Sequence, residues 1–324
     1  MEQTRLDEIL ESQLNRTLMG TDLPDLGKRY LGKVRDSYVD GGSRAVVVTD
    51  RLSAFDVVIG TVPFKGQVRN QIGQYWFEQT AEIAPNHLVS VPDPNVMMVR
   101  ECRPLPMKLI VRAYLTGSTR TSMWGAYERG EREFCGHTLP DAMRKNDQLP
   151  QPLATPATRS PSGARGEALS REQLVSTGAV SAEQYDQAAE MVTALFAFGQ
   201  ERAAGRGLIL VDGTYELGIS LGGDMVVIGE IHTPDVARYW HAKNYEARHA
   251  SGEEPLGLDA DYVHRWLVED MGFRGTSEPP DLPDDVRMEA ARRYIATYEL
   301  LTGQAFEPDT DEPQSRIARN LGCI

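Results

Sequence analysis

The chain has 324 residues, of which 41% are hydrophobic and 25% charged, and it is long enough for two subdomains that share one cleft. Its net charge of −13 argues against a general binder of nucleic acid or anionic membranes, although a local arginine cluster can still bind a small anion. Three scattered cysteines indicate neither a disulfide framework nor a zinc site. The absence of an apolar leader or spanning segment leads us to expect a cytoplasmic protein.

The N-terminal part is predicted to begin with a helix and a hairpin. Leucine and isoleucine recur at helical spacing over residues 4–18, which predicts an amphipathic helix. Residues 30–39 and 45–48 read as two strands, and Gly41-Gly42 is the turn expected between them.

The first of these strands carries Gly32, Lys33 and Arg35. A glycine beside cationic side chains allows backbone amides and positive charges to approach a phosphate together. The spacing is not that of a P-loop, and a solvated basic strand edge is the alternative interpretation.

Residues 50–56, DRLSAFD, are expected to form a loop that offers Asp50, Ser53 and Asp56. A helix around residues 70–84 should follow. Further strands are expected near residues 87–91, 97–102 and 109–111.

Residues 111–127 combine a cation with a helix start. Arg112 leaves a strand, and Thr116-Gly117-Ser118 reads as a turn that opens a helix toward Tyr127. Hydroxyls and free amides at a helix start, with an arginine nearby, can bind phosphate or carboxylate. Simple N-capping by Ser118 uses the same geometry, so the two interpretations are compatible.

The remaining segments are a loop, three helices and a tail. Residues 148–170 are rich in Pro, Ser and Gly, and we expect a long surface loop. Helices are predicted over residues 181–202, 259–270 and 283–301, the last with Gly303 as its C-cap, and residues 306–324 as a loosely held polar tail.

Residues 207–240 form the most informative stretch. The apolar runs 208–211 and 225–228 flank a Gly-Gly-Asp turn, which predicts a hairpin with carboxylates on one face. Such carboxylates, Asp212, Glu216 and Glu230, could hold Mg²⁺. Ordinary polar residues on a half-exposed hairpin are the competing interpretation.

Six blocks of this sequence, in order, resemble those of the phosphoribosylaminoimidazole-succinocarboxamide synthase (SAICAR synthetase) family. The likeness extends over residues 31–303. The blocks are GKVRDSY (32–38), TDRLSAFD (49–56), VRAYLTGS (111–118), TPATR (155–159), DGTYELG (212–218) and TPDVARYW (233–240).

The resemblance implies an α+β, ATP-grasp-like fold of two subdomains with antiparallel sheets and an ATP cleft between them. We expect a β-rich ATP-binding part over residues 1–110 and a larger part with the substrate and metal sites over residues 111–324. The implied reaction joins the carboxylate of carboxy-aminoimidazole ribotide to L-aspartate through an acyl phosphate, with ATP and Mg²⁺.

By similarity, the candidate residues divide by role. Asp212 and Arg159 are assigned to catalysis, and Glu216 and Glu230 to the metal. ATP is assigned to Gly32, Lys33, Arg35 and Lys108, and the other substrates to Asp50, Ser53, Asp56, Arg112, Ser118 and Arg238.

The sequence departs from the family pattern at the reacting centre. Thr214 stands where the family has Lys, Gly229 where it has a metal-binding Asp, and Lys108 where it has Glu. Arg159 replaces a Lys, and Arg165-Gly166 replace a His-Asp pair. Glu230 would point to the opposite face if it lay on the strand next to position 229.

The preferred hypothesis is therefore an ADP-forming carboxylate–amine ligase of purine biosynthesis. A diverged paralogue acting on another heterocycle or amine, a non-catalytic ribotide binder and a phosphotransferase are the alternatives. The expected partners are small molecules, with neither nucleic acid nor membrane, and the oligomeric state is left open.

Overall fold

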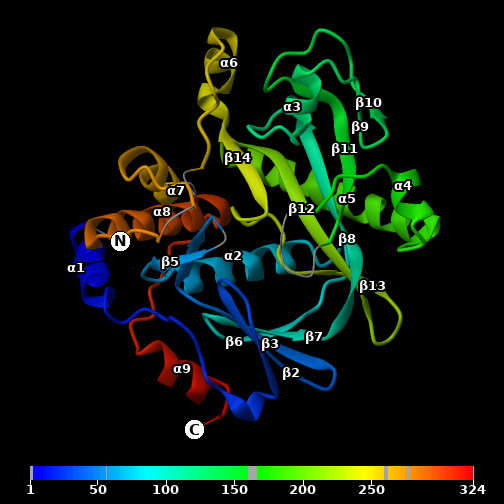
Figure 1. Cartoon of the computed structure of the whole chain (residues 1–324). Helices are drawn as coiled ribbons and strands as arrows, with labels where there is room; N and C mark the ends of the chain where they lie inside the picture. The colour runs from blue at the N-terminus through cyan, green and yellow to red at the C-terminus, as the bar shows by residue number, and fades with distance from the viewer. Residues whose placement is uncertain (1–2, 56, 160–165, 259–261, 276–277, 324) are drawn as a thin grey trace. The chain divides into compact units, whose positions relative to one another are not determined.

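The computed structural model describes the chain except residues 1–2, 56, 160–165, 259–261, 276–277 and 324 (Figure 1). The chain divides into two compact units. Unit 1 comprises Met1–Glu78, His87–Glu101 and Asp259–Ile324, and unit 2 comprises Gln79–Asn86 and Cys102–Leu258. These units are discontinuous in sequence, whereas the predicted division at residue 110 is linear. The functional roles expected of the two parts stay predictions.

Unit 1 contains a five-stranded antiparallel sheet in the order β1-β2-β3-β7-β6. Its strands are β1 (Lys28–Leu31), β2 (Arg35–Asp40), β3 (Ser43–Val48), β6 (Leu88–Asp93) and β7 (Val96–Arg100). The predicted hairpin around Gly41-Gly42 is confirmed by the pairing of β2 with β3. The single strand predicted over residues 30–39 is instead two strands, separated by a tight loop at residues 32–34.

Residues 50–56 were expected to form a loop, and this prediction is wrong for residues 51–54. They form β4 (Arg51–Ala54), which pairs with β5 (Val57–Thr61) in a two-stranded sheet. This strand has only four residues, the minimum for a recognisable period-2 pattern, so its signal in the sequence is weak. Asp56 lies outside the described residues.

The helices of unit 1 lie near the predicted positions, but two differ in their ends. The helix predicted over residues 70–84 begins and ends five residues earlier, and the N-terminal helix ends at Gln13 instead of residue 18. Helix α8 ends at Gly303, which has a φ of 71° and caps the helix as expected. Of the predicted helix 259–270, the described part is α7 and a π-helical turn. The helices are α1 (Gln3–Gln13), α2 (Lys65–Gln79), α7 (Tyr262–Arg265), the π turn (Trp266–Asp270), α8 (Asp284–Thr302) and α9 (Pro313–Asn320), with a 3₁₀ turn at Pro24–Leu26.

The C-terminal segment is not the loose tail that its polar composition predicted. Helix α9 buries Ile317 completely in a cluster with Leu18, Tyr38 and Val47 of unit 1. Arg316 is also buried, and its Nε lies 3.0 Å from the buried carboxylate of Asp93. A short helix that is polar on average can still dock firmly through one apolar residue and one buried ion pair.

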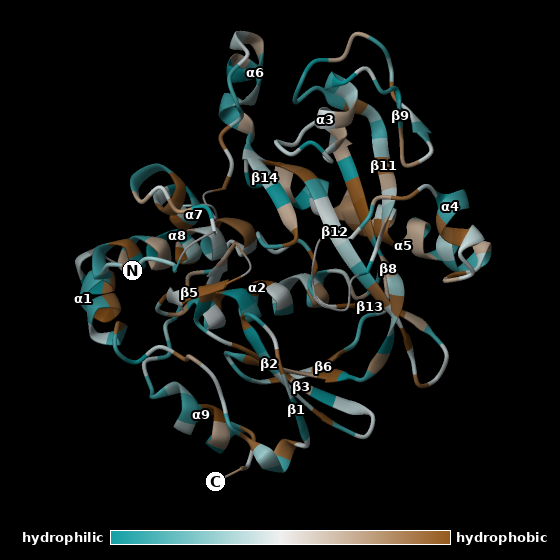
Figure 2. Ribbon diagram, viewed as in Figure 1, coloured by the Kyte–Doolittle hydropathy of each residue, from teal (hydrophilic) through white to brown (hydrophobic). Residues whose placement is uncertain are grey.

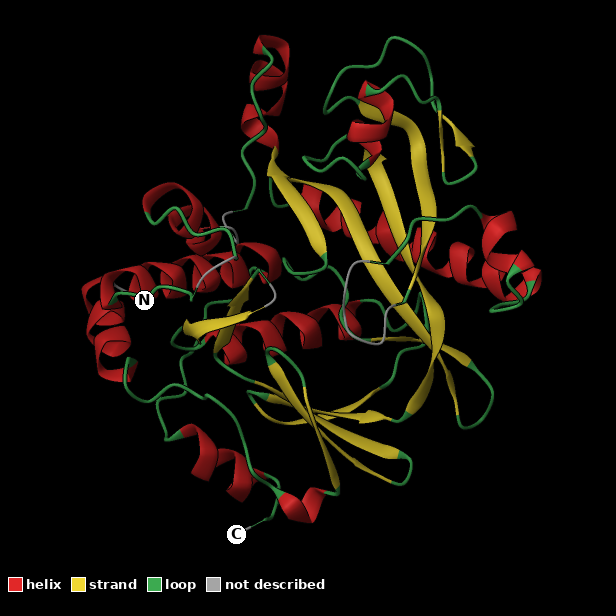
Figure 3. Cartoon of the chain, in the orientation of Figure 1, coloured by secondary structure: helices red, strands yellow, loops and turns green. Residues whose placement is uncertain are grey.

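Unit 2 is built on a second antiparallel sheet in the order β11-β8-β12-β13, with β14 also pairing β12 (Figure 3). Its strands are β8 (Cys102–Tyr114), β11 (Gln148–Thr158), β12 (Leu208–Ser220), β13 (Met225–Ile228) and β14 (Ala237–His241). A small hairpin of β9 (Glu133–Phe134) and β10 (His137–Thr138) forms a separate two-stranded sheet. The antiparallel α+β fold class is thereby confirmed.

The predicted hairpin around Gly222-Gly223 exists, but its first strand is longer than expected. Residues 216–219 of β12 pair with β13, whereas residues 208–213 pair with β14. The predicted surface loop at residues 148–170 is also partly wrong, because residues 148–158 form β11 and pair with β8. Residues 160–165 lie outside the described part of the chain.

Helix α5 (Ala182–Ala204) packs on one face of the unit 2 sheet, against β8, β11 and β12 (Figure 1). Its inner residues Val192, Leu195 and Phe196 are fully buried, as the helical spacing predicted. By contrast, α6 (Ala242–Ser251) has no fully buried residue and is coloured largely hydrophilic in Figure 2. The other helices of this unit are α3 (Met123–Glu128) and α4 (Arg171–Ser176).

Among the helices that the structure describes, none combines the length and the apolar character needed to span a bilayer.

Candidate functional site

The candidate site lies on the face of the unit 2 sheet opposite the residues that contact α5. Along β8, Met107, Leu109 and Val111 are fully buried, so the alternate residues Lys108 and Arg112 lie on the other, half-exposed face. Polar and charged side chains from three strands therefore gather on one surface.

A β-bulge in β12 sets which of its side chains reach that face. The register with β14 shifts between Leu210 and Asp212, and the adjacent residues Leu210 and Val211 are both buried. The alternation then resumes with Asp212, Thr214 and Glu216 on the half-exposed face. Without the extra residue, the carboxylates would face the core instead.

The first charged row crosses three strands at Asp212. Arg112 of β8 and Arg238 of β14 are both cross-strand partners of Asp212, so the carboxylate lies between two arginines. Arg238 Nη2 is 3.6 Å from Asp212 Oδ2, and its side chain is 44% exposed. Formal charges of +1, −1 and +1 leave this row with a net charge of +1, so it can attract an anion.

Two threonines, neither of them among the predicted site residues, contact these arginines. Thr155 Oγ1 accepts a 3.1 Å hydrogen bond from Arg112 Nε and donates to the carbonyl of Ile110. Thr116 Oγ1 lies 3.5 Å from Arg238 Nη1. Thr155 is the first residue of the TPATR block, but its role could not be predicted because residues 148–170 were expected to form a loop.

Ser118 is exposed in the loop that follows β8, and it is not a helix cap. Ser122 caps α3 instead, accepting a hydrogen bond from the backbone N–H of Gly125. The capping interpretation of Ser118 is therefore wrong. Its hydroxyl stays a predicted phosphate ligand.

The second charged row joins three residues that the sequence assigned to three different roles. Lys108 Nζ is 2.7 Å from Glu216 Oε1, and Arg159 Nε is 3.2 Å from Glu216 Oε2. Lys108 and Glu216 are cross-strand partners, while Arg159 directly follows β11. This row also carries a net charge of +1.

These two cations control the ionisation of Glu216. Burial alone would raise the pKa of this carboxyl, but the hydrogen bond and charge of Lys108, together with Arg159, outweigh burial and lower it. Glu216 is therefore a permanent carboxylate at neutral pH.

The residues around Glu216 do not fit a divalent metal held by the protein. Both carboxylate oxygens already accept from a cation, and Gly229, where a Cβ would lie 3.8 Å from the Cβ of Glu216, has no side chain. Glu230 lies beyond the end of β13, so the strand-parity argument does not apply to it, and it accepts a hydrogen bond from Thr233. Among the described residues, no group of three or more His, Cys, Asp or Glu side chains could hold a metal ion.

A buried aromatic pair supports the sheet beneath Thr214 and Glu216. Tyr215 is fully buried, and its hydroxyl lies 2.6 Å from His232 Nε2. Burial lowers the pKa of His232 to about 3, so its imidazole is neutral at physiological pH. Tyr239 donates a hydrogen bond to the carbonyl of His232, which fixes the backbone that precedes Thr233.

In unit 1, Gly32, Lys33 and Arg35 surround the tight loop between β1 and β2. The loop closes through a 2.8 Å hydrogen bond from the N–H of Gly32 to the carbonyl of Arg35, and Lys33 is exposed. Arg51 holds the loop from beneath, donating to the carbonyls of Gly32 and Lys33. Arg51 also pairs with the buried Asp36 at 2.8 Å, a supporting role that the sequence did not reveal.

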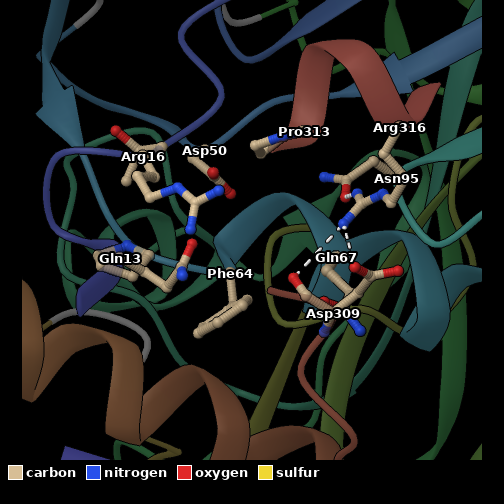
Figure 4. Close-up of a pocket in the computed structure, with 11 residues that line it drawn as sticks. Gln13, Arg16, Asp50, Phe64, Gln67, Asn95, Asp309, Pro313 and Arg316 are labelled. Atoms are coloured by element: carbon tan, nitrogen blue, oxygen red, sulfur yellow. Dashed lines mark hydrogen bonds and ion pairs between the residues drawn. The ribbon is translucent and has the colours of Figure 1, made fainter. Parts of the chain in front are cut away.

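Asp50 is buried rather than displayed on a loop. Its carboxylate accepts hydrogen bonds from the N–H groups of Leu18, at 2.7 Å, and Gly66, at 2.8 Å. It also lines a small cavity with Arg16 and Phe64 (Figure 4). Since the cavity volume is ≈ 10 Å³, it has room for about one water molecule and is too small for a substrate. Ser53 is half-buried on β4, and its predicted contact with substrate is untested.

Comparison with protein-family models matches residues 28–279 to SAICAR synthetase. Among curated proteins, the chain is 43% identical to a putative phosphoribosylaminoimidazole-succinocarboxamide synthase 2 of Mesorhizobium japonicum, over 94% of this chain and 98% of the relative. It is 42% identical to the phosphoribosylaminoimidazole-succinocarboxamide synthase of Legionella pneumophila (strain Lens), over 94% and 97% of the two chains.

Solved structures give the same result. The SAICAR synthase of Saccharomyces cerevisiae, solved in complex with SAICAR, aligns with a TM-score of 0.76 at 26% identity, over 90% of this chain and 100% of that one. A type-2 SAICAR synthetase in complex with ADP aligns with a TM-score of 0.62 at 19% identity, over 86% and 100% of the chains, which supports the fold.

Proposed function

The chain belongs to the SAICAR synthetase family, and on this premise we propose that it joins the carboxylate of carboxy-aminoimidazole ribotide to the amine of L-aspartate, with ATP as the energy source. The observation that carries the proposal is the pair of net-positive rows on one sheet face, centred on Asp212 and Glu216. Four residues of one strand separate them by about 13 Å. This spacing suits an elongated substrate with an anionic group at each end.

The ribotide phosphate belongs, in this proposal, at the row of Arg112, Asp212 and Arg238. Arginine matches phosphate oxygens with a planar fork of N–H donors. Asp212 pairs with the guanidinium group of Arg238, and Thr155 holds that of Arg112. Ser118, on the neighbouring loop, supplies a hydroxyl to the same phosphate.

The reacting carboxylate then lies toward the row of Lys108, Glu216 and Arg159. The γ-phosphoryl group of ATP is transferred to a carboxylate oxygen, which gives an acyl phosphate and ADP. The aspartate amine attacks the acyl carbon, the C–O bond to phosphate breaks, and an amide, inorganic phosphate and a proton are released. Arg159 and Lys108 offset the negative charge that builds up on the phosphoryl oxygens.

The loop at Gly32 and Lys33 is the proposed contact for the ATP phosphates, with Arg35 beside it. Arg51 holds its backbone carbonyls, so the loop is pre-organised and little ordering is needed when nucleotide binds. Asp50, Ser53 and Asp56 remain proposed contributors to substrate binding. Because the metal fit at Glu216 is poor, no step of this mechanism is assigned to a protein-held Mg²⁺.

The deciding experiment measures ADP release from the full-length protein with ATP, Mg²⁺ and carboxy-aminoimidazole ribotide, with and without L-aspartate. ADP and SAICAR formed in equal amounts only when aspartate is present support the ligase. Ribotide binding without ADP release would instead identify a non-catalytic ribotide binder. ADP release that needs the ribotide but not aspartate would instead identify a phosphotransferase that stops at the acyl phosphate.

A further inference from the structure

We propose that Lys108 occupies the cation position beside Glu216, so that this chain neutralises the carboxylate with its own ammonium group and excludes a divalent cation there. Lys108 holds this position in the free protein, without any ligand. The consequence for catalysis, that any Mg²⁺ in the reaction is held by the nucleotide phosphates, rests on the proposed function.

The carboxylate of Glu216 already contacts two cationic side chains. Its Oε1 is 2.7 Å from Lys108 Nζ and its Oε2 is 3.2 Å from Arg159 Nε, so a cation already contacts each oxygen. Mg²⁺ binds oxygen at about 2.0–2.1 Å and requires near-octahedral geometry. An ion at that distance from either oxygen would lie close to a fixed positive charge and be repelled by it.

The surroundings of Glu216 supply no compensating oxygen ligands. A Cβ placed on Gly229 would lie 3.8 Å from the Cβ of Glu216, so this position faces the carboxylate but brings no side chain to it. Glu230, the adjacent acid, bonds to Thr233. Asp212 is four residues away on the strand, at about 13 Å, and belongs to the other row.

Charge leads to the same conclusion. Lys108 and Arg159 contribute two positive charges and Glu216 one negative charge, so the cluster is net positive. A protein site for a divalent cation normally carries an excess of carboxylates. This cluster therefore favours an anionic group of the substrate over a metal ion.

The test is Mn²⁺ binding without any nucleotide or ribotide, measured by the loss of the free-ion signal in electron paramagnetic resonance. The wild type should show no one-to-one complex tighter than about 1 mM, and Glu216→Gln should not change the titration. Lys108→Glu places a second carboxylate opposite Glu216 and should bind Mn²⁺ at least about tenfold more tightly, because the ligand count rises. Adding Glu216→Gln to this variant should remove the gain.

Lys243→Glu is the matched control, because it makes the same charge change on the exposed helix α6 of the same unit. A wild-type site that Glu216→Gln abolishes would overturn the proposal. So would a folded Lys108→Glu variant that binds no better than the control.

A second measurement needs no substitution at Lys108. In protein labelled with ¹³C at the glutamate carboxyl, the Glu216 resonance, assigned from Glu216→Gln, should not move when Mg²⁺ is added. A saturable shift would contradict the proposal. These experiments contain no substrate, so failure of the ligase assay would leave their outcome unaffected.

Discussion

Arg112 is the residue through which the proposed phosphate site can be tested most directly. Replacing it by methionine keeps its bulk and removes the charge beside Asp212. Since a hydrogen bond to a charged group contributes about 1.5–3 kcal/mol, kcat/KM for the ribotide should fall about 10- to 100-fold. The loss should appear mainly in KM, because the phosphate does not react and is bound equally in the ground and transition states.

Arg103→Met is the control for Arg112→Met. Arg103 is an exposed arginine near the other end of β8, so its loss should leave KM unchanged. Steady-state kinetics with varied ribotide at saturating ATP and aspartate measure both variants. A normal KM with a collapsed kcat in Arg112→Met would assign the residue to the reacting centre instead.

Asp50 should make the stability of the protein depend on pH. Burial raises its pKa from 3.8 to about 6, and the two backbone hydrogen bonds only partly oppose this effect. The folded state therefore binds the proton more tightly than the unfolded state. The resulting stabilisation is complete below pH 3.8 and is lost as the pH rises through about 6.

This loss of unfolding free energy amounts to about 3 kcal/mol, since each unit of pKa difference between the folded and unfolded states corresponds to about 1.4 kcal/mol. Urea unfolding of wild type and Asp50→Asn at several pH values between 4 and 7 measures it. As the pH rises, the unfolding free energy of the wild type should fall relative to that of Asp50→Asn. A difference that does not vary with pH would show that Asp50 ionises normally.

At the scale of the element, β11 shows why a strand was mistaken for a loop. Its sequence, QLPQPLATPAT, contains three prolines, which read as loop punctuation. Proline cannot donate to a ladder but is tolerated on an edge strand, and β11 lies at the edge of its sheet. Edge position depends on the pairing of distant segments, so this part of the sequence could not reveal it.

Helix α9 provides a stability prediction with an internal control. Arg316→Met leaves the buried carboxylate of Asp93 without its main cation, which should cost about 3–5 kcal/mol. Arg319→Met, on the same helix, breaks an exposed pair with Asp311 and should cost at most about 1 kcal/mol. Chemical denaturation of both variants measures the contrast, and equal costs would show that α9 is not docked through Arg316.

At the scale of the whole molecule, local patterns predicted the β2–β3 hairpin and the ends of α5 and α8, because turn residues and caps act within a few positions. They did not predict the alignment of Arg112, Asp212 and Arg238, which depends on strand pairing and on a bulge of one residue. Nor did they predict that residues 259–324 return to unit 1. The family motifs named these charged residues as candidates, but the contacts of Glu216 with Lys108 and Arg159 became visible only in the structure.

The proposed division of ligands between the two units can be tested by hydrogen exchange on the full chain. ADP alone should slow exchange in β1 and β2 around Gly32. The ribotide alone should slow it in β8, in the middle of β12 and in β14. At a ligand concentration of 100 times Kd, the stabilisation is about 2.7 kcal/mol, so amides exposed only by opening of the site should exchange about 100-fold more slowly.

Residues 313–320, in α9, serve as an internal reference, because this helix belongs to unit 1 but contributes none of the proposed ligand contacts. Protection by ADP confined to β8 and β12 would reverse the assignment and place the nucleotide on the charged rows of unit 2.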